Sequence, residues 1–247
     1  MARKNNELVT IDFWNTLVKA EAGGEQRREV RLRALRQVAA EHDTELTIDD
    51  ISRAKREASK KFDKIWFAEQ RTPTSEELVN TIISHLGIPA GDSEKGYLIR
   101  QFEESLWEGP PELSRNAREV IENLSGSYRL GLISDTMYSP GRVLRRYLEN
   151  QGLLDFFEGF VFSDETGFSK PNPRAFKKLL DSHNCNPARS WHIGDLMETD
   201  IKGAKNLGMN AILFTGHYKG RYNSDIEIDA EPDHVCETWV EVSEVLL

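Results

Sequence analysis

The sequence predicts an α/β fold: a Rossmann-like doubly wound parallel sheet into which an all-α domain is inserted. Three observations indicate this fold. Residues 7–12 form an apolar, β-type run that reads as a strand. From about residue 22 to 108 the chain is charged, shows helical spacing and contains no convincing strand. From residue 114 onward, strand-like runs alternate with helical segments, which is typical of a parallel sheet covered by helices on both faces.

The inserted segment is expected to contain several amphipathic helices. Its first apolar stripe consists of Val30, Leu32, Leu35 and Val38. A later helix is expected to start in the sequence Thr74-Ser75-Glu76-Glu77 and to stop at Gly87. The sequence Gly109-Pro110-Pro111 then marks the end of the helical segment.

In the remainder of the chain, each expected helix is followed by an expected strand. The helices are expected at about 114–125, 139–150, 172–183 and 199–207. The strands are expected at about 128–134, 159–163, 189–194 and 210–214. A short strand near 233–236 and a C-terminal helix complete the pattern.

The composition is that of an ordinary globular protein of 247 residues, with 38% hydrophobic and 30% charged residues. The formal net charge of −9 gives no support to binding of nucleic acid or of an anionic membrane. No apolar run approaches the roughly 18–20 residues that span a bilayer. Cys185 and Cys236 form no CxxC pair, so a reducing, cytoplasmic location is expected. The oligomeric state is not predictable from these properties.

Polar residues follow the apolar runs at several expected strand ends. Asp12 ends the first strand, and Ser134 follows the apolar run at 130–133. Lys170 lies in a loop that contains two prolines and leads into a helix. Asp195 and Asp200 lie in the sequence Gly-Asp-Leu-Met-Glu-Thr-Asp after another apolar run. Because open α/β sheets present their chemistry at the carboxyl ends of the strands, these residues are the candidate site.

These four segments, in this order, resemble the motifs of the haloacid dehalogenase (HAD) superfamily, most of whose members are Mg²⁺-dependent phosphatases. The resemblance covers residues 7 to about 236. It implies a HAD core formed by residues 1–18 and 112–247. It also implies that residues 19–111 form a helical cap domain that closes over the active site. The implied substrate is a small phosphorylated molecule.

The resemblance assigns the nucleophile and the metal ligands. Asp12 is expected to attack phosphorus and to form an aspartyl-phosphate that water then hydrolyses. Asp12, Asp195 and the backbone carbonyl of Trp14 are expected to bind Mg²⁺, which takes oxygen ligands and keeps several waters. Asp200 is expected to belong to the same metal site by orienting metal-bound water.

The resemblance also assigns the phosphate-binding residues. The hydroxyl of Ser134 and the ammonium of Lys170 are expected to hold phosphoryl oxygens, and Lys170 offsets repulsion between Asp12 and an anionic substrate. Asp135 stands where Asn is commoner in the family and is a further candidate for phosphate binding. Glu198 is expected at the surface.

Trp14 departs from the family pattern at a decisive position. HAD phosphatases carry a second Asp two residues after the nucleophile, which protonates the leaving oxygen and later activates water. Such general acid–base help is worth roughly 10²–10⁴-fold in rate. An indole offers neither a useful pKa nor an acceptor. The chain is therefore expected to use a substrate with a good leaving group, to take an acid from the cap or the substrate, or to turn over slowly.

Three alternatives remain open at this point. HAD dehalogenases also lack the second Asp, but they need no Mg²⁺ and lack the full Gly-Asp-x-x-x-x-Asp motif that this chain keeps. Phosphonatases keep Mg²⁺ and use a cap lysine to form a Schiff base. A catalytically impaired HAD-fold binding or regulatory protein is the third, although the retained Asp12, Lys170 and Asp195 count against it. The lysines available in the cap are Lys55, Lys60, Lys61 and Lys64.

Overall fold

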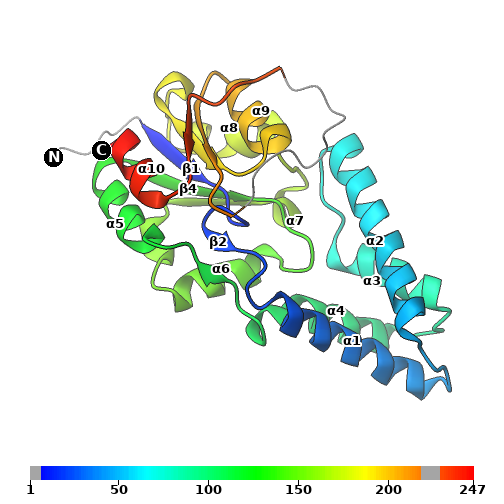
Figure 1. Cartoon of the computed structure of the whole chain (residues 1–247). Coiled ribbons are helices and arrows are strands. Elements are labelled where there is room, and N and C mark those ends of the chain that lie inside the picture. The colour runs from blue at the N-terminus through cyan, green and yellow to red at the C-terminus, as the bar shows by residue number, and fades with distance from the viewer. Residues whose placement is uncertain (1–6, 218–228) are drawn as a thin grey trace.

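A computed structural model describes residues 7–217 and 229–247 of the chain (Figure 1). Its centre is a six-stranded parallel sheet with the strand order β5-β4-β1-β6-β7-β8. This confirms the predicted α/β fold with a doubly wound parallel sheet. The strands are β1 (Leu8–Ile11), β4 (Arg129–Ser134), β5 (Gly159–Phe162), β6 (Trp191–Gly194), β7 (Asn210–Phe214) and β8 (His234–Cys236).

Helices cover both faces of the sheet because successive residues of each strand point to opposite faces. Val9 and Ile11 of β1 pack into one hydrophobic cluster, whereas Leu8 packs into another. The first cluster also contains residues of α5 (Ala117–Ser127), α6 (Gly141–Asn150) and α10 (Trp239–Leu246). The second contains residues of α8 (Pro173–Ser182) and α9 (Lys202–Lys205).

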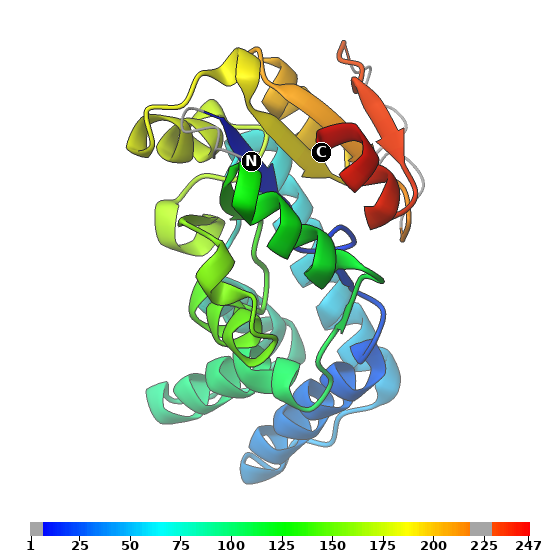
Figure 2. The same cartoon turned by 90° about the vertical axis from the view of Figure 1, so that its left-hand side faces the viewer.

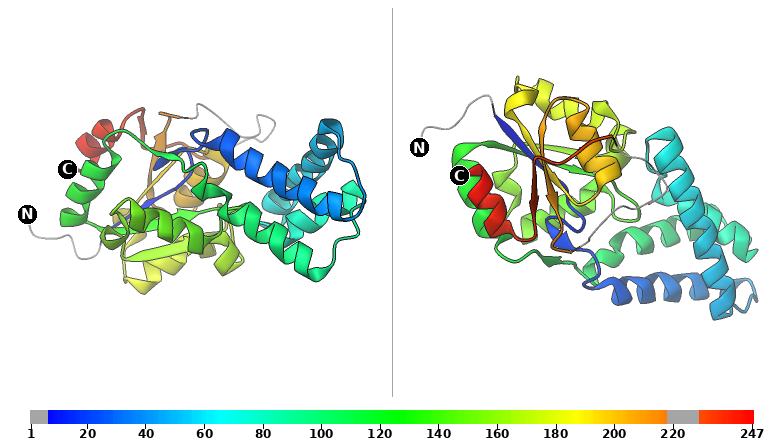
Figure 3. Two further views of the ribbon diagram at one scale, coloured as in Figure 1. Left: turned by 90° about the horizontal axis from the view of Figure 1, so that it is seen from below. Right: turned by 45° about the horizontal axis from the view of Figure 1, so that its top comes forward.

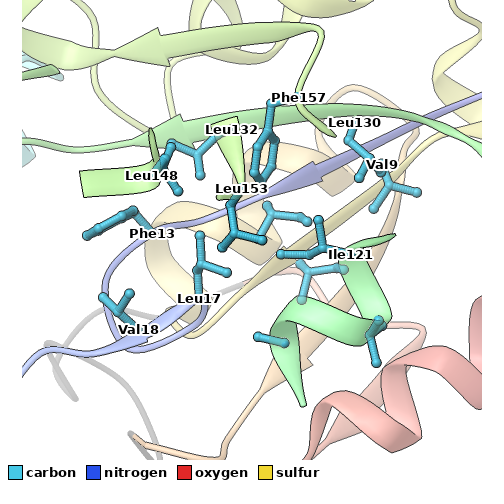
Figure 4. Packing of buried hydrophobic residues seen from close by; sticks show 14 of the residues in the cluster. Val9, Phe13, Leu17, Val18, Ile121, Leu130, Leu132, Leu148, Leu153 and Phe157 are labelled. Carbon is cyan, nitrogen blue, oxygen red and sulfur yellow. The ribbon is translucent and has the colours of Figure 1, made fainter. Parts of the chain in front are cut away.

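The first cluster extends from the sheet to the loop that follows β1. Phe13 and Leu17 of this loop are fully buried members of this cluster, and Figure 4 shows both among its side chains. The indole Nε1 of Trp239, in the C-terminal helix, donates a hydrogen bond to the Thr16 carbonyl at 3.1 Å. The loop that carries Asp12 is therefore held by the core on one side.

The segment between β1 and β4 is helical, as predicted. Its helices are α1 (Gly24–Glu41), α2 (Ile48–Glu69), α3 (Ser75–Leu86) and α4 (Asp92–Glu104). They lie to one side of the α/β layers (Figures 1 and 2) and enclose a hydrophobic cluster of their own. Thr74 caps α3 through a reciprocal bond with Glu77, and Gly87 ends the helix with φ 66°. Both ends of α3 thus confirm the signals read from the sequence.

The two segments that join this helical block to the sheet pair with each other, which the sequence did not predict. β2 (Val18–Lys19) runs antiparallel to β3 (Glu112–Leu113). Beyond them, Gly23 with φ 69° lies so close to Gly109 that an added Cβ would approach its carbonyl oxygen to 2.3 Å. The Arg27 guanidinium donates to carbonyls of both segments, those of Ala20, Ala22 and Gly109.

Several short elements complete the described structure. They are the 3₁₀ turns Ser105–Trp107, Leu154–Phe156 and Pro187–Arg189, the short helix α7 (Ser163–Thr166) and a π-helical turn at Met197–Ile201. The helix expected at 199–207 is therefore a π-helical turn followed by α9. Within residues 7–217 and 229–247, no helix is both long and apolar enough to cross a bilayer.

Candidate active site

The carboxyl ends of three neighbouring strands bring the candidate residues together. Asp12 follows β1, Ser134 ends β4 and Asp195 follows β6, and β1 lies between the other two strands. A cavity of about 480 Å³ opens at this edge, between the sheet and the helices α1 and α2. Both helices lie to the same side of the sheet in the two views of Figure 3. Its wall on the sheet side includes Asp12, Trp14, Asp135, Lys170, Asp195 and Asp200.

Lys170 lies at the centre of the buried charged groups. Its ammonium donates to Oδ1 of Asp12 and, at 2.7 Å, to Oδ1 of Asp200. All three side chains are almost completely buried. An ion cluster removed from water is stable only when each charge has a partner, so this arrangement requires the lysine and both carboxylates together. The lysine loop, a segment distant in sequence, is thus fixed beside Asp12 by direct contact.

Burial and mutual repulsion shift the carboxyl pKa values at this site. Burial raises the pKa of Asp12 to about 7, although Lys170 opposes the rise. Burial also raises the pKa of Asp195, and the neighbouring Asp12 and Asp200 carboxylates add to that rise. Burial acts against ionisation of Asp200 too, yet Lys170 and a hydrogen bond from His192 hold its pKa below the usual range. The ionised forms of Asp12 and Asp195 are therefore disfavoured, because the described protein groups compensate their negative charge only in part.

These donors fit a divalent cation. Asp195 is 4% exposed and lines the cavity, and among residues 7–217 and 229–247 no side chain hydrogen-bonds to its carboxylate. Within the described part of the chain, no three His, Cys, Asp or Glu side chains converge as a complete metal cage. Mg²⁺ does not require such a cage, since it is commonly held by one or two carboxylates together with waters and substrate phosphate. Asp12, Asp195 and a backbone carbonyl would supply such a partial set.

His192 supports this cluster and was not identified from the sequence. It lies on β6, opposite Thr10 of β1 in register, and is fully buried. Its Nε2 lies 2.8 Å from Oδ1 of Asp200, and its Nδ1 lies 2.8 Å from the Thr10 hydroxyl. Burial lowers the pKa of His192, so the neutral ring donates from Nε2 to Asp200 and accepts from Thr10. A polar residue inside an apolar strand, three residues before Asp195, was the available signal.

Ser134 ends β4 with a hydroxyl that has no hydrogen-bond partner among the described residues, although its oxygen is buried. A buried hydroxyl without a partner is costly, which makes it a ready donor to a bound oxyanion. The side chain of the next residue is already engaged. Asp135 accepts from the Lys170 backbone N–H at 3.0 Å and from the Trp66 indole at 2.9 Å, and burial raises its pKa to about 6.

Trp14 follows Asp12 by two residues, and its half-buried ring lines the cavity. The ring packs edge-on against Phe13 at 4.9 Å, and the Arg27 guanidinium lies 5.9 Å from its centroid. Glu198 differs from expectation. It is 4% exposed instead of lying at the surface, because the π-helical turn that carries it packs beneath the strand ends.

Helices α1 and α2 contribute the other wall of the cavity, which the sequence could not specify. These residues are Arg27, Arg31, Ser59, Phe62, Asp63 and Trp66, with Met137, Tyr138 and Ser139 from the loop after β4. None of the four lysines considered from the sequence is among the residues that line this cavity. Lys60 instead pairs with Glu57, and Lys61 donates to Thr81.

Comparison with known proteins gives a consistent family. Residues 47–214 match the family described as haloacid dehalogenase-like hydrolase. The chain is 38% identical over 126 residues to the glyceraldehyde 3-phosphate phosphatase of Methanothermobacter thermautotrophicus, an alignment that covers 50% of each protein. It is 29% identical over 124 residues to the pyrimidine 5′-nucleotidase YjjG of Escherichia coli, covering 50% of this chain and 49% of that protein. The chain thus spans about half the length of the curated relatives it matches.

Solved structures share the fold over nearly the whole chain. A 2-haloacid dehalogenase from Pseudomonas syringae is similar with a TM-score of 0.71 and 21% identity, covering 97% of both chains. A HAD phosphatase from Thermococcus onnurineus gives a TM-score of 0.60 and 18% identity, also over 97% of both chains. The magnesium-bound HAD-hydrolase YfnB of Bacillus subtilis gives 0.66 and 21%, covering 98% of this chain and 99% of that chain.

Proposed function

This chain belongs to the haloacid dehalogenase-like hydrolase family, and on that basis we propose that it is a Mg²⁺-dependent phosphatase of small phosphorylated molecules. The observation that carries the proposal is the buried contact of Lys170 with both Asp12 and Asp200 at the strand ends, beside Asp195. The phosphatase names of several curated relatives support the same reaction class. We propose further that α1–α4 act as the cap, within residues 19–111.

In this proposal, the Asp12 carboxylate attacks phosphorus in line, the ester oxygen leaves, and an aspartyl-phosphate forms. Water then attacks phosphorus and regenerates Asp12 with release of inorganic phosphate. Mg²⁺, held by Asp12, Asp195 and the Trp14 carbonyl, would supply charge neutralisation at the phosphoryl group. Asp200 holds Lys170 beside Asp12, and the cluster thereby stays ordered between the two steps.

The phosphoryl oxygens need donors that are already in place, since such donors stabilise charge without reorganisation. We assign this role to the Ser134 hydroxyl and the Lys170 ammonium. For Asp135 we assign the backbone N–H, because its carboxylate would repel a phosphate and is occupied by Trp66 and Lys170. Asp135 thus remains a phosphate-binding residue in the proposal, through its main chain.

The leaving oxygen needs a proton that Trp14 does not supply. Among the described residues of the cavity wall formed by α1 and α2, Asp63 carries the one carboxyl group. We propose that this carboxyl takes the place of the missing acid. Because it comes from the helical block, the acid would reach the substrate only when the block lies against the sheet, as it does here.

Phosphate release from a panel of phosphate esters and acyl phosphates, with Mg²⁺ or with EDTA, tests the proposal. The expected result is Mg²⁺-dependent release that is abolished in Asp12→Asn. Halide release from haloacids without Mg²⁺ would instead establish dehalogenase chemistry, the reaction named for the Pseudomonas syringae structure. Borohydride trapping of a lysine with a carbonyl substrate would establish phosphonatase chemistry.

A further inference from the structure

Arg31 is a cavity-lining cation without a counterion. It lies on α1, lines the same cavity as Asp12, and is half-buried. Among the residues that the structure describes, no carboxylate pairs with it; its polar partner is the Ser105 hydroxyl, 3.0 Å from Nε. The guanidinium lies 4.6 Å from the centroid of Tyr138 and 5.8 Å from that of Phe102.

This environment orients the guanidinium but does not neutralise it. The bond to Ser105 uses Nε, and the two rings hold the plane by cation–π contact. The terminal amino groups, Nη1 and Nη2, have no described hydrogen-bond partner. These are the groups that bind a carboxylate or phosphate as a fork. Burial lowers the pKa of Arg31 to about 10, so it stays charged at neutral pH.

The neighbouring Arg27 differs from Arg31 because its terminal amino groups are hydrogen-bonded. Arg27 lies one helical turn before Arg31 and also lines the cavity. Its terminal amino groups donate to the carbonyls of Ala20, Ala22 and Gly109, so they are occupied by the joining segments. Arg27 thus uses its terminal amino groups to hold the joining segments, whereas those of Arg31 have no described partner.

We infer that Arg31 binds a second anionic group of the substrate, so that the preferred substrates are small phosphate esters that also carry a carboxylate or a second phosphate. The inference rests on the proposed function, because it takes the first phosphate to lie at Asp12. Arg31 also lines a second cavity, of about 260 Å³, in which Arg28 and Lys55 are balanced in number by Glu25 and Glu29. The inference therefore rests on Arg31 itself.

Binding of non-hydrolysable analogues tests this inference without requiring turnover. Titration calorimetry in Mg²⁺ would compare phosphonoacetate, phosphonopropionate and phosphonobutyrate with the alkylphosphonates of matched length. The expected result is that one carboxylate analogue binds about tenfold more tightly than its match, and that Arg31→Met removes this preference. An alkane bisphosphonate of the same length distinguishes a second phosphate from a carboxylate.

Arg33→Met is the matched control, since Arg33 is an exposed arginine on the same helix, and it is expected to keep the preference. Arg31→Lys retains the charge without the fork and is expected to keep part of it. Equal binding of both series by the unaltered protein, or a preference that persists in Arg31→Met, would overturn the inference. Failure of the proposed function would give a different result, in which the phosphonates bind but no phosphate ester is hydrolysed.

Discussion

At the scale of single residues, position 14 raises the question of which group protonates the leaving oxygen. An indole there lines the cavity beside Asp12 and contributes no proton. The Arg27 guanidinium lies 5.9 Å from the ring, so a carboxylate at this position would have a cation nearby. The surroundings are therefore compatible with the acid that family phosphatases carry.

Trp14→Asp is accordingly expected to raise kcat for alkyl phosphates, whose leaving oxygen needs a proton. The gain expected is at least about tenfold, at the low end of general acid–base effects. Little change is expected for 4-nitrophenyl phosphate, whose leaving group departs without protonation. Steady-state kinetics with both esters check this, and an equal effect on both would show that position 14 does not govern the leaving group.

Asp63→Asn tests the proposed substitute acid, and here a loss of kcat is expected instead of a gain. Loss of the proposed proton donor is expected to lower kcat for alkyl phosphates by about tenfold or more and to spare 4-nitrophenyl phosphate. Ser59→Ala changes another α2 residue of the same wall and is the matched control. An unchanged alkyl phosphate rate in Asp63→Asn would remove Asp63 from the mechanism.

His192 gives a prediction for pH. Its folded-state pKa lies below the ordinary value of 6.5, so the unfolded chain binds its proton more readily than the folded chain. Stability contributed at this position is therefore present at neutral pH and is lost as pH falls below about 6.5. Comparing the free energy of unfolding of the unaltered protein with that of His192→Asn, the difference should shrink at acid pH. A difference that grows on acidification would contradict the neutral ring.

At the scale of elements, α2 and the segment after it contact the loops that carry Asp135 and Lys170. The Trp66 indole donates to Asp135, the Ser169 N–H donates to the Gln70 carbonyl at 2.8 Å, and the hydroxyls of Thr72 and Ser163 are hydrogen-bonded. Asp135 receives Trp66 from the helical block and Lys170 from the sheet side, so it links the two.

Trp66→Phe removes that link but keeps an aromatic ring in the wall. It is expected to raise KM by several-fold, about the value of one hydrogen bond to a carboxylate, with kcat less affected. Trp107→Phe changes a half-buried tryptophan that does not line the cavity and should leave KM unchanged. The same KM in Trp66→Phe as in the unaltered protein would show that the indole bond does not hold the wall in place.

The elements were predictable where a local signal marks them. Strand β7 falls at the predicted residues 210–214, and the Thr74 and Gly87 signals bound α3. The pairing of β2 with β3 was not predictable, because two-residue strands carry no period and meet only when the helical block folds back. The wall formed by α1 and α2 was missed for a related reason: which helical face meets the sheet depends on tertiary packing.

At the scale of the whole molecule, the helical block and the α/β layers meet at one charged site. The helical block has its own buried cluster, against which Met137 and Tyr138 from the loop after β4 pack. The sheet positions Asp12, Ser134 and Asp195 because neighbouring parallel strands end at one edge. The motif residues on the sheet were therefore recognisable from sequence, whereas the set of α1 and α2 residues that lines the cavity was not.

The charge of Asp195 is expected to affect the stability of the whole protein. Its pKa is raised in the folded state, so an ionised Asp195 is disfavoured there, and removing its charge at neutral pH should stabilise the protein without metal. Thermal unfolding should show a higher Tm for Asp195→Asn than for the unaltered protein in EDTA. Added Mg²⁺ should raise Tm only for the unaltered protein, because binding to the folded state stabilises it. An equal Mg²⁺ shift in both proteins would place the cation elsewhere.

The most direct measurement is mass spectrometry of the protein quenched in acid during turnover of a phosphate ester with Mg²⁺. The account predicts a peptide that contains Asp12 and has gained the mass of one phosphoryl group, with no such species in Asp12→Asn. In ¹⁸O-labelled water, the label should then appear in released phosphate and not in Asp12, since water attacks phosphorus. Label in the Asp12 carboxylate, or turnover that persists in Asp12→Asn, would contradict the aspartyl-phosphate.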